Sequence, residues 1–290
     1  MAAAIDMSEA SGLWRVSASE LDPMSASTFG TGQLVADALQ RGARKILVGL
    51  GGSATNDGGL GMAAALGFQF FGIDGVPLAA IPANLRALAQ IQLRSKPIGA
   101  AILALSDVGN PLAGERGASR VFGPQKGASP RAVEELDAGL VCLADVVARD
   151  LGCDYRNAPG AGAAGGLGFG LLSFCGAKMR SGFEMIAEIL RLEDQVAASD
   201  LVITGEGRLD AQTLEGKGPA GVAALARKYG KPVIAFAGAV TGDMRLGEVF
   251  DETCAITPPD MPLEEAMQTA SSLLEKSAIQ AARRFAVSRC

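Results

Sequence analysis

The chain has no histidine among its 290 residues. A serine–histidine–aspartate triad, a histidine general base and a histidine-ligated metal are therefore excluded within this chain. Any proton transfer that it catalyses must fall to aspartate, glutamate or lysine. The sequence also has no GxxxxGK[ST] phosphate loop, no HRD or DFG motif and no clean GxGxxG after a strand. These absences exclude a Walker-type loop and a protein kinase, and they leave only weak support for a dinucleotide site.

Aromatic residues, basic charge and long apolar runs are also scarce. Aromatics make up 5% of the residues, so the core must be built mainly from Ala, Val, Leu and Ile. The formal net charge is −5 and the basic residues are scattered, which argues against a nucleic-acid partner. No apolar run approaches the ~20 residues that span a bilayer, and the N-terminus has no basic start. The five cysteines form no CxxC pair and are typical of a reducing compartment. We therefore expect a cytoplasmic protein with no membrane partner.

Glycine is abundant, with 38 residues that gather in clusters. The most informative cluster lies in residues 45–61, KILVGLGGSATNDGGLG, between an apolar strand and an Ala-rich helix. A turn of this kind can leave backbone N–H groups free near a helix N-terminus, where phosphate binds well. The candidate binding residues are Gly51, Gly52, Ser53, Thr55 and Asn56. The alternative is a tight strand-to-helix turn that holds no ligand.

Alternating strands and helices predict an α/β fold with parallel sheets that carry helices on both faces. We expect a domain boundary near residue 200, which gives domains 1–199 and 200–290. The second domain has only about three strands, which is few for a sheet of this kind.

A further glycine cluster, residues 160–170, suits close packing of a small-residue helix. The expected strands are 45–50, 68–71, 98–106, 201–203, 232–237 and 252–256. Helices are expected at 28–42, 131–151 and 217–229. Three further helices are expected: one that ends near 66, one that begins at 181 and a last one that begins at about 260. Loop-rich stretches are expected at 72–97 and 108–119.

Acidic side chains follow three of the expected strands: Asp57, Asp107, and Glu206 together with Asp210. Ligands of open α/β sheets gather at the carboxyl ends of strands, where carboxylates can hold Mg²⁺ or take a proton from a hydroxyl. Phosphoryl transfer requires such carboxylates together with cations that neutralise the moving group. A single aspartate could instead cap a helix, and a single cation could be a solvated surface charge. The nearby cations are Arg116, Arg120, Lys126, Arg208 and Lys217.

Four sequence blocks together resemble the type I glycerate kinases. The first block is TFGTGQL (28–34) with GLGGSATNDGGLG (49–61), and the second is SDVGNPLAGERGASRVFGPQKGAS (106–129). The third is PGAGAAGGLGFG (159–170) with SGFE (181–184), and the fourth is DLVITGEGRLDAQTLEGKGPAGVA (200–223). The blocks occur in family order and cover nearly the whole chain.

The resemblance implies ATP-dependent phosphorylation of D-glycerate with Mg²⁺, at the 2-hydroxyl, by a phosphotransferase that acts on an alcohol group. It implies two α/β domains, a Rossmann-like one that holds both chain ends and a second, family-specific one inserted within it. ATP and the small acid are the implied partners, with a homodimer as a further expectation. Carried onto this chain, the catalytic candidates are Asp57, Asp107, Lys126, Glu206, Arg208 and Asp210. The candidates for binding the metal are Asp107 and Asp210. The candidates for binding the substrate or a phosphate are Gly51, Gly52, Ser53, Thr55 and Asn56 of the glycine loop, together with Asn110, Arg120, Gly205 and Lys217.

The chain departs from the family pattern before its first residue. Family members carry a further N-terminal segment with the first Rossmann-like strand, so we expect an incomplete Rossmann-like domain here. Smaller departures are Phe29 in the GTG block and Gly109 before Asn110. Two other functions therefore stay open at this point: a glycerate- or phosphate-binding protein of the same fold with impaired catalysis, and a dinucleotide-dependent oxidoreductase that binds at 49–61.

Overall fold

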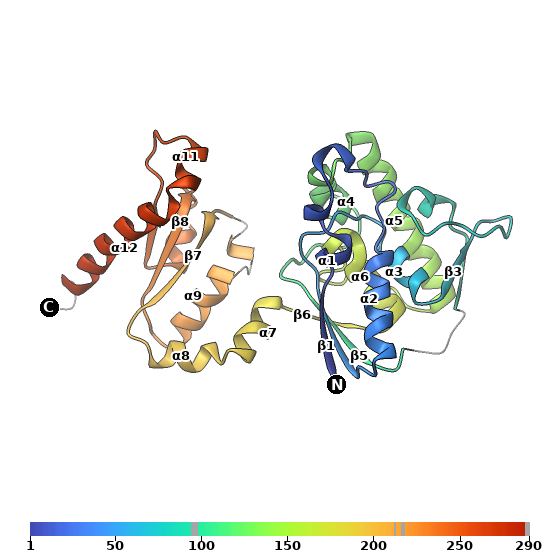
Figure 1. The fold of residues 1–290 in the computed structure, drawn as a ribbon, viewed down its shortest axis with the longest axis horizontal. Helices are drawn as coiled ribbons and strands as arrows, with labels where there is room; N and C mark the ends of the chain where they lie inside the picture. Colours follow the sequence, from blue (N-terminus) through green and yellow to red (C-terminus); the bar gives the residue numbers. More distant parts are fainter. Residues whose placement is uncertain (94–97, 212, 216–217, 288–290) are drawn as a thin grey trace. The chain divides into compact units, whose positions relative to one another are not determined.

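A computed structural model describes residues 1–93, 98–211, 213–215 and 218–287 (Figure 1). The chain forms two compact units, Met1–Gly182 and Phe183–Cys290, which are described separately below. The division lies before the boundary that we predicted near residue 200, because helices α7 (Gly182–Ile189) and α8 (Leu192–Ala198) come after it. The correspondence of the units to the two predicted domains stays a prediction.

The first unit is built on a parallel four-stranded sheet in the order β1-β2-β5-β6. Its strands are β1 (Ala2–Asp6), β2 (Lys45–Gly49), β5 (Ala101–Leu105) and β6 (Lys178–Arg180). In the central pair, Ile46 lies opposite Ile102 and Val48 opposite Ala104, and all four side chains are buried. Parallel strands require crossover connections, and helices supply them here, which confirms the predicted α/β class.

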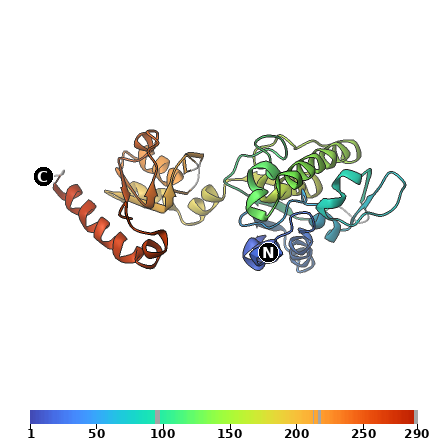
Figure 2. The ribbon, with the colours of Figure 1, turned by 90° about the horizontal axis from the view of Figure 1, so that it is seen from above.

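Helices built from small and aliphatic residues pack on this sheet (Figure 2). The predicted helix 131–151 is confirmed as α5 (Pro130–Leu151), whose hydroxyl cap Ser129 accepts from the N–H of Ala132. The apolar residues that recur at helical spacing along it are buried: Val133, Leu136, Leu140, Leu143 and Val147. The other helices of the unit are α1 (Ser8–Ser11), α2 (Phe29–Gln40), α3 (Leu60–Ala65), α4 (Ala118–Phe122) and α6 (Ala163–Cys175).

The expected loop at 72–97 contains regular structure that the sequence did not predict. Strand β3 (Phe68–Phe71) pairs antiparallel with β4 (Gln90–Leu93), and this hairpin is separate from the main sheet. A 3₁₀ helix at Pro82–Ala87 lies between them and packs on α5. The segment QIQL is too short for its alternation to be distinguished from a loop, and it becomes a strand by pairing with β3.

The glycine cluster at 160–170 packs directly on the first glycine loop. Residues Ala164, Gly165 and Gly166 are left-handed inside α6, and the carbonyl of Gly165 accepts from the N–H of Gly58 at 3.0 Å. A Cβ added to Gly165 would lie 1.9 Å from the carbonyl oxygen of Thr55, and one added to Gly170 would lie 2.7 Å from that of Gly58. The close-packing interpretation of this cluster is therefore confirmed.

We expect Gly165→Ala to lower the free energy of unfolding by about 2 kcal/mol more than Gly176→Ala does. Gly176 has a φ of +59° but nothing within 4 Å of an added Cβ, so it isolates the cost of the left-handed backbone. Gly165 adds a collision with the backbone of the glycine loop. Urea unfolding of both variants measures the difference; equal losses would contradict the packing of α6 on that loop.

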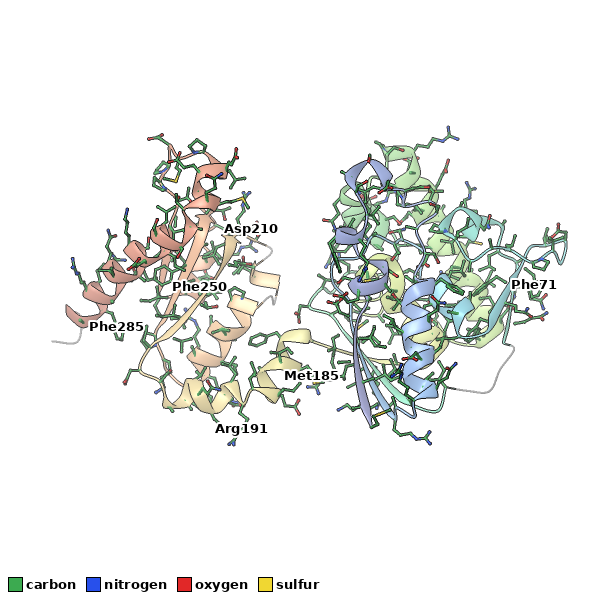
Figure 3. All side chains as sticks on the ribbon, in the orientation of Figure 1. Phe71, Met185, Arg191, Asp210, Phe250 and Phe285 are labelled. Atoms are coloured by element: carbon green, nitrogen blue, oxygen red, sulfur yellow. The ribbon has the colours of Figure 1, made fainter. Side chains whose placement is uncertain are left out.

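The second unit contains a parallel three-stranded sheet in the order β7-β8-β9. Its strands are β7 (Val202–Leu209), β8 (Val233–Val240) and β9 (Glu252–Ala255), as the sequence predicted in number and place. Strand β7 is longer than predicted: Glu206 pairs with Ala237 and Arg208 with Ala239, so both belong to the strand and not to the loop that we expected. Phe250, labelled in Figure 3, is buried in the core with Val233 and Ala235. Helices α9 (Gly218–Lys228) and α10 (Leu246–Val249) pack beside this sheet.

The predicted C-terminal helix is two helices, α11 (Leu263–Gln268) and α12 (Ala270–Val287). The helix is interrupted at Thr269, where both the hydroxyl, at 2.7 Å, and the backbone N–H, at 3.0 Å, donate to the carbonyl of Glu265. The spacing of Leu263 and Met267 predicts that both lie on an apolar face of this helix, but both are mostly exposed. In the described parts of the chain, no helix combines the length and apolar character that a membrane crossing requires.

Candidate functional site

A lysine amine lies at the base of a hollow in the first unit. Lys126 ends the 3₁₀ turn Pro124–Lys126, and its side chain is buried, with 1% of the residue's surface exposed. Its Nζ donates to the hydroxyl of Ser53 and to the carbonyl of Thr55, both at 2.7 Å. Both acceptors are neutral and both belong to the glycine loop, so the lysine joins this loop to the turn that follows α4.

The hollow is small and its lining contains no acidic residue. Its volume is about 190 Å³, and it lies where β2 and β5 end, since Leu50 and Val108 follow these strands. The backbone N–H groups of Gly51 and Gly52 donate to no other residue in the described parts of the chain. The hollow is lined by Leu13, Leu50, Gly51, Gly52, Ser53, Val108, Phe122, Gln125, Lys126 and Ala164.

Burial lowers the pKa of Lys126 from 10.5 to about 7, while the charge of Asp57 acts in the opposite direction. Desolvation disfavours the charged amine because two neutral oxygens replace only part of its hydration. An anion that entered the hollow would supply the missing charge. The site is therefore suited to a small oxyanion.

Asp57 lies in the same loop but faces the interior. It is fully buried; its Oδ2 accepts from the N–H and the hydroxyl of Thr28, both at 2.8 Å, and from the N–H of Gly61 at 3.1 Å. Its Oδ1 accepts from the N–H of Gly59 at 3.0 Å. Burial raises the pKa of Asp57, and these four donors oppose that rise. The N–H groups at the start of α3, which we expected to be free for phosphate, are thus occupied by Asp57 itself.

Thr55 and Asn56 are also buried. The amide of Asn56 donates to the hydroxyl of Ser119 at 2.8 Å, while Asn56 Oδ1 and Thr55 Oγ1 have no partner in the described parts of the chain. Neither residue lines the hollow. Their contacts favour a role in holding the loop in shape, and their predicted role in binding stays a prediction.

Asp107 follows β5 directly and accepts from the hydroxyl of Ser181 at 2.7 Å. The next residue, Val108, lines the hollow, whereas Asp107 itself does not. Asn110 donates to the carbonyl of Arg116 at 2.8 Å and does not line the hollow.

Arg120 does not line the hollow either. Its guanidinium lies 3.7 Å from a carboxylate oxygen of Glu115 and 3.9 Å from one of Asp137. The first unit thus brings together Lys126, Ser53, Gly51 and Gly52 around the hollow, while Asp107 does not line it.

In the second unit, three of the predicted residues meet at the carboxyl end of β7. The hydroxyl of Thr213 donates to Glu206 and accepts from the N–H of Asp210 at 3.1 Å. The guanidinium of Arg208 lies 3.6 Å from the carboxylate of Asp210, which is labelled in Figure 3. Gly205 lies inside β7, where an added Cβ would lie 2.4 Å from the carbonyl oxygen of Phe236, so close strand pairing explains this glycine. Lys217 lies outside the described residues.

Sequence reasoning missed three hydroxyl residues that hold these carboxylates, namely Thr28, Ser181 and Thr213. Thr28 and Ser181 each begin one of the sequence blocks, and Thr213 lies within another. A hydroxyl residue near the start of a helix was the only feature of the sequence that marked these three positions. The sequence did not show which carboxylate each hydroxyl contacts, because that contact depends on the fold.

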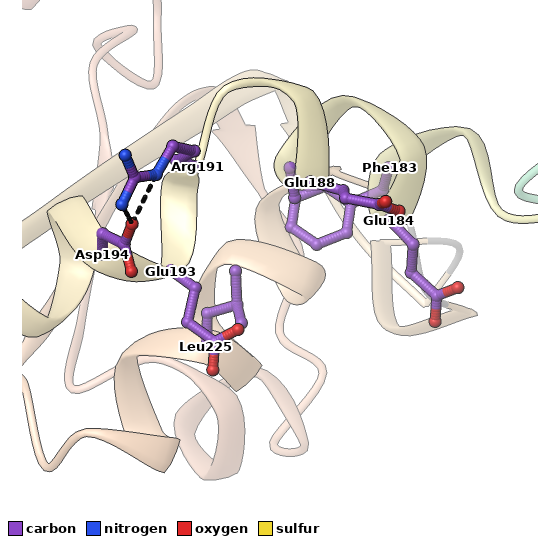
Figure 4. Close-up of a pocket in the computed structure, with 8 residues that line it drawn as sticks. Phe183, Glu184, Glu188, Arg191, Glu193, Asp194 and Leu225 are labelled. Atoms are coloured by element: carbon purple, nitrogen blue, oxygen red, sulfur yellow. Dashed lines mark hydrogen bonds and ion pairs between the residues drawn. The ribbon is translucent and has the colours of Figure 1, made fainter.

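A second hollow, of about 370 Å³, lies within the second unit and is acidic (Figure 4). Arg191 pairs there with Asp194 at 2.6 Å, and Glu193 accepts from the hydroxyl of Tyr229 at 2.6 Å. The remaining lining includes Glu184 and Glu188, so its field repels anions. The hollow at Lys126 is therefore the better candidate for an anionic ligand.

Comparison with known proteins gives the same picture across the whole chain. The chain matches the profile of the glycerate kinase family over residues 1–286. It is 44% identical to a glycerate kinase of Halalkalibacterium halodurans over 290 residues, which covers 98% of this chain and 75% of the relative. It is 46% identical to a glycerate 2-kinase of Escherichia coli K12 over 243 residues, which covers 83% of this chain and 64% of that protein.

A solved structure agrees with these sequence relatives. The crystal structure of a protein assigned as glycerate kinase 2 from Salmonella typhimurium LT2 matches with a TM-score of 0.76 and 42% identity. The match covers 99% of this chain and 76% of that one. On the breadth of these matches, the chain belongs to the glycerate kinase family.

Proposed function

We propose that this protein phosphorylates D-glycerate with ATP and forms 2-phosphoglycerate. The relatives named glycerate kinase and glycerate 2-kinase support the reaction and its position. The observation that carries the proposal is the buried amine of Lys126, in a hollow whose lining has no acidic residue. A cation suits the anionic end of a small hydroxy acid, and the proposal takes Asp107, which precedes the lining residue Val108 in the chain, as the carboxylate that activates the hydroxyl.

The two units contribute different groups to this proposal. In the first, Asp107 orients the attacking hydroxyl and takes its proton, while Ser181 holds the carboxylate in place. In the second, the strand end with Glu206, Arg208 and Asp210 serves the nucleotide, because a guanidinium neutralises phosphate charge. Asp57 acts as a positioning residue for the glycine loop. Cytoplasmic location and association into a homodimer stay predictions.

Magnesium fits this proposal through one or two carboxylates. In the residues that the structure describes, no three His, Cys, Asp or Glu side chains form a metal site. Magnesium bound with nucleotide commonly uses one or two carboxylates, substrate phosphates and water, so either predicted ligand, Asp107 of the first unit or Asp210 of the second, is chemically suited to supply one carboxylate. When bound, the ion neutralises phosphate charge and orients the transferred group.

The test is ATP turnover that depends on D-glycerate. We expect ADP release only when the full chain, ATP, magnesium and D-glycerate are all present, and a phosphorus NMR spectrum that identifies 2-phosphoglycerate. Glycerol in place of D-glycerate serves as the control, because it keeps hydroxyls but lacks the carboxylate. A folded protein without turnover would overturn the proposal.

A second candidate function is binding of the acid without turnover. It is favoured by the fact that the hollow is complete within the first unit. Calorimetry separates the two functions, since this alternative predicts heat of D-glycerate binding with no ADP release.

On the proposed activity, we expect Thr213→Val to lower kcat about 10- to 100-fold with little change in the KM for D-glycerate. The substitution removes the hydroxyl that holds Glu206 and caps Asp210, and Thr213→Ser should restore most of the rate. Thr241→Val is the matched control, because the Thr241 hydroxyl is buried without a hydrogen-bond partner in the described part of the chain. Steady-state kinetics measures kcat and KM for each variant. Equal kcat values for the two valine variants would show that the Thr213 hydroxyl does not position Glu206 and Asp210 for the reaction.

A further inference from the structure

The Lys126 hollow combines a buried cation with a lining that offers it no counter-charge. None of its ten lining residues is acidic, and both acceptors of the amine are neutral. An ammonium group has three donors, and two of them are used, so one remains for a further acceptor. The buried charge of Asp57 acts on the amine, but that carboxylate is held by four other donors and does not line the hollow. Burial of the amine is therefore only partly compensated, and an anion bound in the hollow would reduce the remaining cost.

The shape of the hollow limits the size of this anion. Its volume of about 190 Å³ is below the ~300–1,000 Å³ of sites for drug-sized ligands. A volume of this size matches a three-carbon acid or one phosphate group better than a whole nucleoside triphosphate. The side chains of Leu13, Leu50, Val108 and Phe122 give the hollow apolar walls, which suit a carbon skeleton better than a fully hydrated phosphate.

The two N–H groups at the mouth of the hollow complete the anion site. Gly51 and Gly52 line it, and their N–H groups have no protein acceptor in the described ranges. An added Cβ at Gly51 would meet nothing within 4 Å, so open space lies beside this backbone. Successive free N–H groups of a loop form a concave site for an oxyanion.

We infer that this hollow binds the carboxylate of the hydroxy acid, with Lys126 Nζ as its counter-charge and the N–H groups of Gly51 and Gly52 as further donors. The assignment rests on the proposed function and goes beyond it, because it divides the substrates between sites: the acid binds here, and the triphosphate binds outside this hollow. Arg120, which pairs with Glu115 and Asp137, takes no part. A carboxylate and an inorganic phosphate share the same oxyanion chemistry, so the test includes both.

Calorimetric titration of the full chain at pH 7 tests the assignment, with D-glycerate, glycerol and inorganic phosphate as separate probes. We expect D-glycerate to bind, glycerol to give no binding heat and phosphate not to compete. Lys126→Met should weaken D-glycerate binding at least tenfold, whereas Lys178→Met, which removes an exposed lysine of the same unit, should not change it. Unchanged affinity in Lys126→Met, displacement of D-glycerate by phosphate, or binding of phosphate with no binding of D-glycerate would overturn the assignment.

A second variant keeps the test valid if Lys126→Met does not fold. Gly51→Leu fills the hollow from a position with open space, so it should block D-glycerate while leaving the fold intact. Gly242→Leu, also in open space but in the second unit, is its control.

Failure of the assignment and failure of the proposed function give different results. Turnover of D-glycerate with full affinity in Lys126→Met removes the assignment alone. Binding that depends on Lys126, without turnover, removes the kinase activity alone.

Discussion

Replacing Asp57 by asparagine is expected to lower the free energy of unfolding by about 3 kcal/mol or more. The carboxylate accepts from Thr28 twice and from Gly59 and Gly61, all in the interior. An asparagine presents one oxygen and one NH₂ group, so at least one buried N–H is left facing another donor. The remaining bonds also lose their charge assistance, while the relief of no longer burying a charge offsets part of this cost. The expected loss therefore rests on the buried N–H that is left without an acceptor.

Urea unfolding measures this effect, with Asp37→Asn as the matched control. Asp37 is more than half exposed and pairs with Arg41 four residues later, so its loss should cost less than about 1 kcal/mol. Unchanged or increased stability of Asp57→Asn would mean that burial of the carboxylate costs more than its four bonds return.

Raising the pH from 7 to 10 should stabilise the wild-type protein relative to Lys126→Met by up to about 4 kcal/mol. The pKa of Lys126 is about 7 in the folded protein and 10.5 as the ordinary value. Between these values the unfolded chain binds more protons than the folded one, so stability rises with pH. Below pH 7 both states are protonated, and the difference between the proteins no longer changes.

Unfolding free energies at unit steps of pH provide the measurement. Asp57 is the charged group that acts on this amine, and it is present in both proteins, so its contribution largely cancels in the comparison. The control Lys178→Met keeps Lys126 and should follow the wild-type curve. Parallel curves for wild type and Lys126→Met would show that the amine keeps an ordinary pKa.

Sequence periodicity was sufficient to predict the helices and strands that bury one face in the core. The spacing of Val133, Leu136 and Leu140 predicted α5, and the run at 45–50 predicted β2. Strand β7 was predicted too short because Glu206 and Arg208 alternate with glycine on an edge strand, where polar residues are tolerated. Strand β4 was missed because its stability depends on pairing with β3.

The candidate site was predicted in its residues but not in its geometry. Lys126 was a catalytic candidate, but the sequence did not predict that it is buried and bonded to Ser53 and Thr55, more than seventy positions earlier. Asp57 was also a catalytic candidate, yet its Oδ2 accepts twice from Thr28, 29 positions away. Such contacts depend on tertiary structure, which local patterns do not specify. The resemblance of the four sequence blocks nevertheless indicated the family, because all four occur together and in family order.

A crystal structure of the full chain with D-glycerate would show directly where the carboxylate binds. We expect a carboxylate oxygen within about 3 Å of Lys126 Nζ, in contact with the N–H groups of Gly51 and Gly52. D-glycerate bound at another place, with its carboxylate on Arg120 or on the second unit and no ligand beside Lys126, would contradict this expectation.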